Sequence, residues 1–508
     1  MQKKWIRLLF RRRVAVVLSL LLQIALMIFM VYSSSQTYQW IQYSLTLVSV
    51  LAVLHIIATG ARSGTKLLWS VMILTFPLFG GLLYLMVQLQ GVTMAFRRRL
   101  AVTEKKMQPH FEQDEKTDEK LEEQWATYAN QYNYLTKTCG FRAYENGGTA
   151  YLSPGEQCFE KMLEELEKAE QFIFLEYFII QEGRFWNSVL DVLKKKASQG
   201  VDVRLIYDDM GCFLLLPLDY QKQLGAMGIR CVVFNKFRPV LSTVQNHRDH
   251  RKIMVIDGRV AFTGGVNLAD EYINEKERFG HWKDAAIMHK GRAVNSYTLM
   301  FLTMWQTLTG EEEEVTNFLN LTEGKQGEGF VIPYCDSPVD AEYMGERVYM
   351  NLIHSARRYL YIQTPYLIID DGMVSALVLA AKSGVDVRII TPGIPDKKYV
   401  HITTRSYYRE LLEGGVKIYE YTPGFIHSKL MIADDVVGVV GTVNMDFRSM
   451  FLHFECGSWL CGCPVIENIR TDFTETLQQC KEIQISDCKL GFVKRIVQMI
   501  LRLFAPLL

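Results

Sequence analysis

The sequence predicts two related α/β halves, arranged about a pseudo-twofold axis with mixed and largely parallel sheets, behind an N-terminal membrane helical segment. Three observations lead to this prediction. A motif of His, Lys and Asp with fixed internal spacing occurs twice, and its copies lie 177 residues apart. Apolar strand-like runs alternate with helix-like stretches around each copy, which is typical of βαβ units. Three long apolar runs fall within residues 1–91.

Residues 1–91 are interpreted as a transmembrane and membrane-interface region. Val14 to Tyr32 and Ile41 to Thr59 are each long and apolar enough to form a spanning helix. The first run lacks the small-residue cleavage site of a signal peptide, so we expect it to be retained. A third run, Leu67 to Leu89, carries Pro77 at its centre together with Gly80 and Gly81. We expect a broken helix that re-enters or lies at the interface, and a kinked third span is the alternative.

Charge sets the expected orientation of this region. The basic residues that flank the runs are Lys3, Lys4, Arg7, Arg11, Arg12, Arg13, Arg62, Lys66, Arg97, Arg98 and Arg99, whereas the loop Ser33 to Gln39 has no charge. The positive-inside rule then places the basic groups in the cytoplasm. The sequence therefore predicts a multi-pass protein of the cytoplasmic membrane whose remaining domains face the cytoplasm.

Five segments follow from the pattern. After the membrane region, residues 92–135 are expected to form a charged linker helix, to which we assign no function. The two α/β halves are expected at residues 136–315 and 316–488, because Gly200-Val-Asp-Val-Arg and Gly384-Val-Asp-Val-Arg recur between similar strand and helix patterns. Residues 489–508 are expected to form an amphipathic helix that lies on anionic lipid, with docking on the protein core as the alternative.

The repeated motif supplies the candidate catalytic residues. They are His250, Lys252 and Asp257 in the first copy, and His427, Lys429 and Asp434 in the second. An apolar run follows each histidine, so each copy is interpreted as a buried strand on which side chains two residues apart point to the same face. An imidazole and an ammonium group would then lie together in each half.

A second pattern with the same spacing follows each copy of the motif. Gly265 and Asn267 in the first half correspond to Thr442 and Asn444 in the second, and all four are candidate phosphate-binding residues. Glycine allows a ligand to approach the backbone closely, and amide and ammonium groups donate hydrogen bonds to phosphate oxygens. Two copies facing each other would place two imidazoles at one phosphorus atom.

Composition excludes several classes of partner and cofactor. The formal net charge is +1, so no basic excess favours a nucleic-acid partner. The ten cysteines show no zinc spacing and fit a reducing compartment. We expect no metal and no cofactor. The oligomeric state stays open, a homo-oligomer included.

The paired motifs resemble those of the phospholipase D superfamily over residues 140–508. His247-Arg-Asp-His-Arg-Lys-Ile-Met-Val-Ile-Asp-Gly258 is similar to the first motif of bacterial cardiolipin synthases specifically, and Ile426-His-Ser-Lys-Leu430 and Asn444-Met-Asp-Phe-Arg-Ser449 are similar to the second. The apolar N-terminal region resembles that family too, so the resemblance covers essentially the whole chain. One departure is His453, where the family pattern has asparagine.

The resemblance implies phosphatidyl transfer between two phosphatidylglycerol molecules through a phosphohistidine, giving cardiolipin and glycerol without a metal. It implies that His250 attacks phosphorus while the other histidine acts as the general acid. Asp284 is then expected to orient the histidine of the first half, and Glu455 that of the second. Asp257 and Asp434 are expected to orient local structure, since an aspartate beside a phosphate anion would repel it.

Other functions remain open at this stage. A phospholipase D hydrolase or a phosphatidyltransferase to another alcohol would use the same intermediate. A nuclease of the superfamily is disfavoured because the sequence shows no basic groove studded with aromatic residues. A non-catalytic lipid-binding scaffold is disfavoured because both His–Lys pairs are complete. The expected partners are phosphatidylglycerol and anionic membrane lipids.

Overall fold

The computed structural model describes residues 21, 24–25, 36–60, 62–88, 91–111, 114–236, 246–320, 327–340 and 342–507. These residues divide into two compact units. The described parts of Met1–Ala95, Phe237–Asn246 and Ile496–Leu508 form the first, and those of Phe96–Lys236 and His247–Arg495 form the second. Both predicted α/β halves fall within the second unit.

Helices make up the first unit. They are α3 (Gln36–Ala58), α4 (Ser63–Thr75) and α5 (Pro77–Gln88), with the first residues of α6 (Gly91–Met107) and the part of α18 (Phe492–Leu503) from Ile496 onward. Helix α3 covers most of the predicted second span, whereas the predicted first span, Val14 to Tyr32, lies outside the described residues apart from three positions. Among the residues that the structure describes, none of the helices combines the length and the apolar composition needed to cross a membrane.

The third apolar run is broken at the predicted proline. Helix α4 ends at Thr75 and α5 begins at Pro77, because proline has no N–H group and restricts the residue before it. The predicted break does not extend to Gly80 and Gly81, which lie inside α5. A Cβ atom on Gly80 would meet the carbonyl oxygen of Met72 at 2.6 Å, so this glycine allows α4 and α5 to pack closely.

The predicted linker helix is instead a series of short helices. They are α6 (Gly91–Met107), a turn of 3₁₀ helix at Gln108–Phe111, α7 (Glu115–Trp125) and α8 (Ala129–Asn133). Pro109 lies in the turn that ends α6, where its missing N–H interrupts the helical hydrogen bonds. Helix α8 docks on the sheets, since Gln131 Oε1 accepts a hydrogen bond of 2.6 Å from Trp459 Nε1.

The first half is built on a sheet of seven strands. Their order is β2 (Thr149–Leu152), β10 (Ala286–Lys290), β8 (Val260–Gly264), β7 (Lys252–Ile256), β3 (Phe172–Tyr177), β4 (Asp202–Asp208) and β5 (Arg230–Phe234). Strands β3, β4 and β5 are parallel and are joined through α10 (Arg184–Ser198) and α11 (Tyr220–Ala226), while the other pairs are antiparallel. The sheet is therefore mixed, as predicted.

The second half repeats this order within a sheet of ten strands. The order is β1 (Tyr144–Glu145), β11 (Phe330–Asp336), β20 (His453–Cys461), β18 (Val437–Gly441), β17 (Leu430–Ala433), β12 (Tyr359–Gln363), β14 (Asp386–Pro392), β15 (Lys417–Tyr421) and β21 (Cys480–Glu482), with β6 (Arg248–Asp249) paired to β20. Strands β12, β14 and β15 are parallel and joined through α14 (Asp371–Lys382) and α15 (Lys398–Glu413). The sequence repeat is thus a repeat of strand order.

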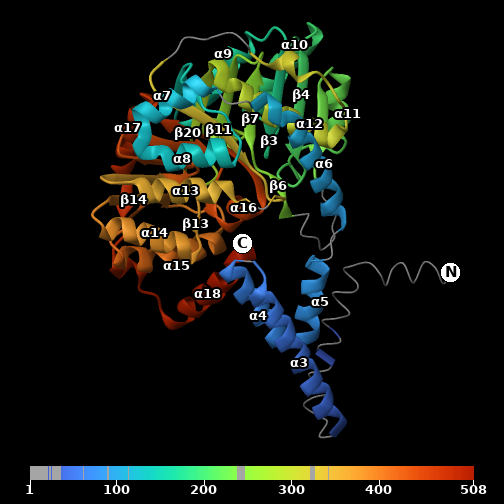
Figure 1. The fold of residues 1–508 in the computed structure, drawn as a ribbon, viewed down its shortest axis with the longest axis vertical. Coiled ribbons are helices and arrows are strands. Elements are labelled where there is room, and N and C mark those ends of the chain that lie inside the picture. The colour runs from blue at the N-terminus through green and yellow to red at the C-terminus, as the bar shows by residue number, and fades with distance from the viewer. Residues whose placement is uncertain are drawn as a thin grey trace, which may run out of the picture. The chain divides into compact units, whose positions relative to one another are not determined.

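Helices cover the sheets, and the two halves meet at their antiparallel strands (Figure 1). Helix α12 (Val294–Thr309) packs on β3, β5, β7 and β8, and α17 (Val465–Leu477) packs on β12, β15 and β17. The remaining helices of this unit are α9 (Gly155–Leu166), α13 (Met344–Ser355) and α16 (Phe447–Phe451). Strands β8 and β10 contact β18 and β20, where His289 Nε2 lies 2.7 Å from Ser458 Oγ.

Three short pairings connect segments outside the main strand paths. Strand β13 (Leu367–Ile368) pairs with β19 (Met445–Asp446), and β9 (His281–Lys283) pairs with β16 (Gly424–Ile426). The third is β6 with β20. At the C-terminal end, α18 (Phe492–Leu503) occupies the predicted amphipathic segment and has no buried side chain.

Candidate active site

Both motif histidines lie immediately before a buried strand at the meeting of the two halves. His250 precedes β7 and His427 precedes β17, and both side chains are buried. Lys252 Nζ donates to the carbonyl oxygen of His250 at 2.5 Å, and Lys429 Nζ donates to that of His427. The two-residue spacing therefore brings each ammonium group to the backbone of its own histidine.

A short strand of the first half holds His250 against the second half. Strand β6 runs parallel to β20 with Arg248 opposite His453 and Asp249 opposite Phe454. The backbone N–H of His250 continues this pairing by donating to Phe454 O at 2.9 Å. The next residue of β20 is Glu455, and its two carboxylate oxygens lie 2.9 and 3.0 Å from His250 Nδ1.

The mirror arrangement holds His427 against the first half. Strand β16 runs parallel to β9, and the backbone N–H of His427 donates to Lys283 O at 2.7 Å. Asp284 follows, and its Oδ2 lies 2.7 Å from His427 Nδ1. Lys429 Nζ is equally close to this nitrogen. Because one ring nitrogen cannot donate and accept at once, the ionised carboxylate is the stronger partner and Nδ1 carries the proton.

This geometry corrects the predicted pairing of histidines and carboxylates. Asp284 was expected to orient His250 and Glu455 to orient His427, each within its own half. The structure exchanges them, so that each histidine is held by a carboxylate of the other half. The cause is the pairing of β6 with β20 and of β9 with β16, which brings each motif beside a strand from the opposite sheet. In both pairs Nδ1 is engaged, which leaves Nε2 for chemistry.

Burial dominates the electrostatics of the four motif cations. It lowers the pKa of His250 to about 3 and the pKa of His427 to about 4, and the neighbouring ammonium groups act in the same direction. It also lowers the pKa of Lys252 to about 8 and that of Lys429 to about 7. An anion in the site would favour the charged form of all four groups. The site can thus gain positive charge when a phosphodiester binds.

The carboxylates remain ionised in spite of burial. Burial alone would raise the pKa of Glu455, but the charge and hydrogen bond of His250 hold it well below its usual range. Burial opposes ionisation of Asp284 in the same way, and His427 and Lys429 lower its pKa. Each carboxylate can therefore stabilise an imidazolium that forms next to it.

Gly265 and Thr442, which occupy equivalent positions after the two motifs, both lie against these carboxylates. A Cβ atom on Gly265 would overlap Asp284 Oδ1, so the glycine makes room for that carboxylate. At the equivalent position, Thr442 Oγ1 donates to Glu455 Oε2 and accepts from Cys456 N at 2.9 Å. Gly265 and Thr442 thus contact the orienting acids, and their contacts with phosphate stay a prediction.

The side-chain amides of Asn267 and Asn444 differ in how many hydrogen bonds they make within the protein. Asn267 Oδ1 accepts from Ile179 N at 2.9 Å, and its Nδ2 donates to Tyr272 Oη at 2.8 Å. Asn444 is also buried, but its Oδ1 has no hydrogen-bond partner among the described residues. Only the amino group of an amide can donate to a phosphate oxygen, and that of Asn267 is committed to Tyr272, so Asn267 is the less available of the two predicted phosphate ligands.

The motif aspartates lie at the far ends of their strands, away from the histidines. Asp257 accepts hydrogen bonds of 2.8 to 2.9 Å from three consecutive backbone N–H groups at the start of β3. Asp434 does the same for three N–H groups at the start of β12, at 2.8 to 3.0 Å. Both therefore tie two strands together, and neither belongs to the catalytic set in which the motif had grouped them.

Several buried charged and aromatic residues around the site carry no repeated sequence signal. Arg251 bonds Glu176 and Asp249, and Arg248 lies 3.2 Å from Asp208. Aromatic rings flank each histidine: Phe178 lies 5.0 Å from His250 between ring centroids, and Trp282 lies 5.1 Å from His427. The local sequence gives one indication of the bonds of Arg251 with Glu176 and Asp249, namely that this arginine stands between His250 and Lys252.

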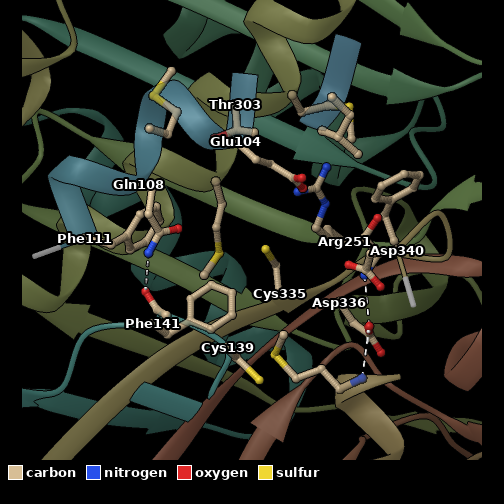
Figure 2. A pocket seen from close by; sticks show the side chains of 18 residues that line it. Glu104, Gln108, Phe111, Cys139, Phe141, Arg251, Thr303, Cys335, Asp336 and Asp340 are labelled. Carbon is tan, nitrogen blue, oxygen red and sulfur yellow. Dashed lines mark hydrogen bonds between the residues drawn. The ribbon is translucent and has the colours of Figure 1, made fainter. Parts of the chain in front are cut away.

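A cavity of about 220 Å³ lies on the reverse side of the strands that carry the site (Figure 2). Arg251 and Phe454 line it, and each is the chain neighbour of a residue that points into the site. Burial raises the pKa of Asp336, another lining residue, to about 8. Side chains alternate along a strand, so this cavity is separate from the histidine site.

Two buried imidazoles, each with Nε2 available and Nδ1 on an ionised carboxylate, define a site for group transfer at phosphorus. One imidazole can attack while the other protonates the leaving oxygen, and the lysines neutralise the anion. The site and fold thus define a transferase of phosphodiesters with a paired-histidine centre.

Comparison with known proteins identifies the family. The family model described as "Cardiolipin synthase, PLD-like domain" matches residues 162–305 and 349–477, and the model "Phospholipase_D-nuclease N-terminal" matches residues 47–88. The chain is 34% identical to a cardiolipin synthase of Alkalihalophilus pseudofirmus over 92% of this chain and 95% of that protein. It is 40% identical to a cardiolipin synthase of Geobacillus thermodenitrificans over 71% and 72% of the two chains. The chain belongs to the cardiolipin synthase family of phospholipase D-like enzymes and is a phosphatidyltransferase of that type.

A solved structure shows the same fold. The crystal structure of phosphatidylserine synthase from Haemophilus influenzae superposes with a TM-score of 0.58 at 14% identity, covering 75% of this chain and 98% of that one.

Proposed function

We propose that the chain transfers the phosphatidyl group of one phosphatidylglycerol to a second phosphatidylglycerol, forming cardiolipin and glycerol. The observation that carries this proposal is the pair of histidines held by carboxylates across the two halves, at 2.9 and 2.7 Å. The two histidines have matching surroundings, each with Nδ1 against a carboxylate of the other half. Such a pair suits a reaction in which a phosphodiester is broken and then re-formed with a chemically similar alcohol.

The first step forms a phosphohistidine. Nε2 of one histidine attacks phosphorus, the bond from phosphorus to the glycerol oxygen breaks, and the other histidine donates its proton to that oxygen. His250 is assigned as the attacking residue on the family resemblance. A general acid must be protonated, and binding of the anionic lipid supplies the charge that raises the depressed pKa of His427.

The second step reverses these roles. His427, now neutral, removes the proton from a hydroxyl of the second phosphatidylglycerol, whose oxygen attacks phosphorus and displaces Nε2 of His250. Lys252, Lys429 and Asn444 stabilise the negative charge on the non-bridging oxygens in both steps. No redox change and no added reactant are needed, and glycerol is the one by-product.

We also propose that the N-terminal helices hold the enzyme at the cytoplasmic membrane, with its catalytic unit on the cytoplasmic side. Large apolar side chains are exposed along α3 and α4, among them Leu47, Val48, Leu51, Leu54, Ile57, Leu67, Val71 and Leu74. Such a surface is unfavourable in water and fits a lipid environment. Basic residues after α3 and in α6 favour a cytoplasmic position for both segments.

Water or another alcohol as the acceptor is the second candidate function, because the phosphohistidine is common to all three reactions. The decisive experiment incubates the purified full-length chain with phosphatidylglycerol alone. Equal molar amounts of cardiolipin and glycerol support the proposal. Phosphatidic acid as the main product would identify a hydrolase and reject it.

The membrane orientation is tested with single cysteines in a background without the ten native ones. Ser34 lies outside the described residues, and Lys105 is exposed on α6. A membrane-impermeant thiol reagent added to intact cells should label Ser34→Cys and leave Lys105→Cys unlabelled. Labelling of Lys105→Cys would place the residues after α5 outside the cell.

A further inference from the structure

His453 is the residue of the site that the proposed reaction does not use. It lies on β20 two positions before Glu455, so both side chains project to the same face. Its ring centroid is 5.5 Å from that of His250, and its Nδ1 is 3.7 Å from Glu455 Oε1, which is beyond hydrogen-bond distance.

Both ring nitrogens of His453 lack a partner. The residue is only 9% exposed, and Nδ1 and Nε2 are buried without a hydrogen bond to any described residue. An unsatisfied buried polar group is unfavourable, so a histidine with two such nitrogens has the capacity to bind a ligand there. The resemblance expects asparagine at this position, so the imidazole departs from the family pattern quoted for this motif.

His453 completes a set of metal ligands. One ligand atom each from His250, His453 and Glu455 lies within 4.8 Å of the other two. Two imidazoles and one carboxylate form a donor set that proteins use for zinc, leaving a fourth position for water. The carboxylates of Glu455 and Asp446 both interact with His453, and Glu455 also offsets the positive charge of Lys252.

The other side of the site cannot bind a metal in this way. Trp282 stands two residues before Asp284, as His453 stands before Glu455. Its indole Nε1 only donates, and it points to Asp284 Oδ2 at 3.5 Å. A chelating set therefore exists beside His250 and not beside His427.

We propose that His250, His453 and Glu455 form an inhibitory site for a divalent transition-metal ion, with zinc as the preferred ion. Bound at Nε2 of His250, the ion occupies the lone pair that must attack phosphorus. Bound at Nδ1, it moves the single ring proton to Nε2, with the same result. The metal therefore blocks this enzyme and is not its cofactor. The inhibition rests on the proposed function, whereas the binding does not.

Zinc binding is measured first, without lipid. The full-length chain in detergent is stripped with a chelator, dialysed against micromolar zinc chloride, and analysed for bound metal. We expect about one zinc per chain that is lost in His453→Asn, which has the side chain that the family resemblance expects. His354→Asn removes an exposed histidine far along the chain and should keep the zinc. Equal zinc in wild type and His453→Asn, or none in wild type, would overturn the proposal.

Inhibition is measured second, with each variant referred to its own zinc-free rate. Loss of one ligand should raise the half-inhibitory zinc concentration at least about 10-fold in His453→Asn, since even residues that only support a ligand contribute that much. Magnesium and calcium prefer oxygen ligands and should not inhibit at the same concentrations. Identical zinc sensitivity of both proteins would refute the site. Zinc binding in a chain that makes no cardiolipin would reject the proposed function alone.

Discussion

Replacing Glu455 with glutamine should reverse the tautomer of His250 while leaving the shape of the site unchanged. Thr442 accepts a hydrogen bond from Cys456 N at 2.9 Å, and its own hydroxyl hydrogen goes to Glu455 Oε2. A competing acceptor for that hydrogen, Cys456 O, is farther away at 3.1 Å. In Glu455→Gln the amide oxygen would face Thr442, and the amino group would take the place of Oε1, which is the nearer of the two oxygens to His250 Nδ1 at 2.9 against 3.0 Å.

The expected fall in kcat follows from the interaction that His250 loses in Glu455→Gln. A charge-assisted hydrogen bond is worth about 1.5–3 kcal/mol, which by itself corresponds to roughly a 10- to 100-fold change in rate. An amino group at Nδ1 also forces the ring proton onto Nε2, the nitrogen that must carry the lone pair. The analogous aspartate-to-asparagine change in a serine protease triad lowers kcat about 10⁴-fold. We therefore expect kcat to fall by about 10³- to 10⁴-fold.

The assay follows cardiolipin formed from phosphatidylglycerol, with thermal unfolding as the control for folding. Adding Thr442→Val to Glu455→Gln removes the hydroxyl that fixes the amide, so the amide can rotate and activity should recover at least about 10-fold. Asp284→Asn tests the other half, where Ala285 N donates to Asp284 Oδ1 at 2.8 Å and would hold the amide oxygen in the same way. Activity of Glu455→Gln within 10-fold of wild type, or a double variant that is no better, would refute the tautomer argument.

The remaining predictions concern the histidines, metal dependence, pH and the motif aspartate. His250→Ala and His427→Ala should each lower cardiolipin formation more than about 10³-fold with an unchanged melting temperature; near-normal turnover of either would reject the two-histidine scheme. Exhaustive chelation should leave activity unchanged or raise it, and loss that one divalent ion restores would contradict this. Burial lowers the pKa of Lys429 to about 7, so the ammonium charge is lost as pH rises past 7. Binding of dimethyl phosphate, a phosphodiester that keeps one negative charge over this range, should therefore weaken between pH 7 and 9 when measured by calorimetry, and constant affinity would refute it. Asp434→Ala removes three backbone hydrogen bonds and should cost about 2–4 kcal/mol of unfolding free energy while folded enzyme keeps its kcat; an unchanged melting temperature would contradict that role.

Local periodicity was sufficient to predict the elements that carry the motif. The apolar runs after His250 and His427 are buried strands. The two-residue spacing brings Lys252 to the backbone carbonyl of His250 and Lys429 to that of His427. The proline in the third apolar run ends a helix where predicted. These features depend on residues close in sequence, so the pattern alone determines them.

Pairing across the halves could not be predicted in the same way. Whether Glu455 bonds His250 or His427 depends on which strand edges meet when the two sheets pack, and no local pattern encodes this. The contacts of Gly265 and Thr442 follow from that packing too, because each lies against one of these carboxylates. For His453 the single signal in the sequence was its departure from the family pattern.

The spacing of the carboxylates shows why the whole second unit must fold before either half is competent. Every position of the motif repeats after 177 residues, but Asp284 and Glu455 are 171 residues apart. Asp284 and Glu455 therefore do not occupy equivalent positions of the sequence repeat. They reach their histidines through β9 with β16 and β6 with β20, and each pairing joins one half to the other. A half folded alone would present a histidine whose tautomer nothing fixes, so the contact between the halves is what makes two ordinary imidazoles into a nucleophile and an acid.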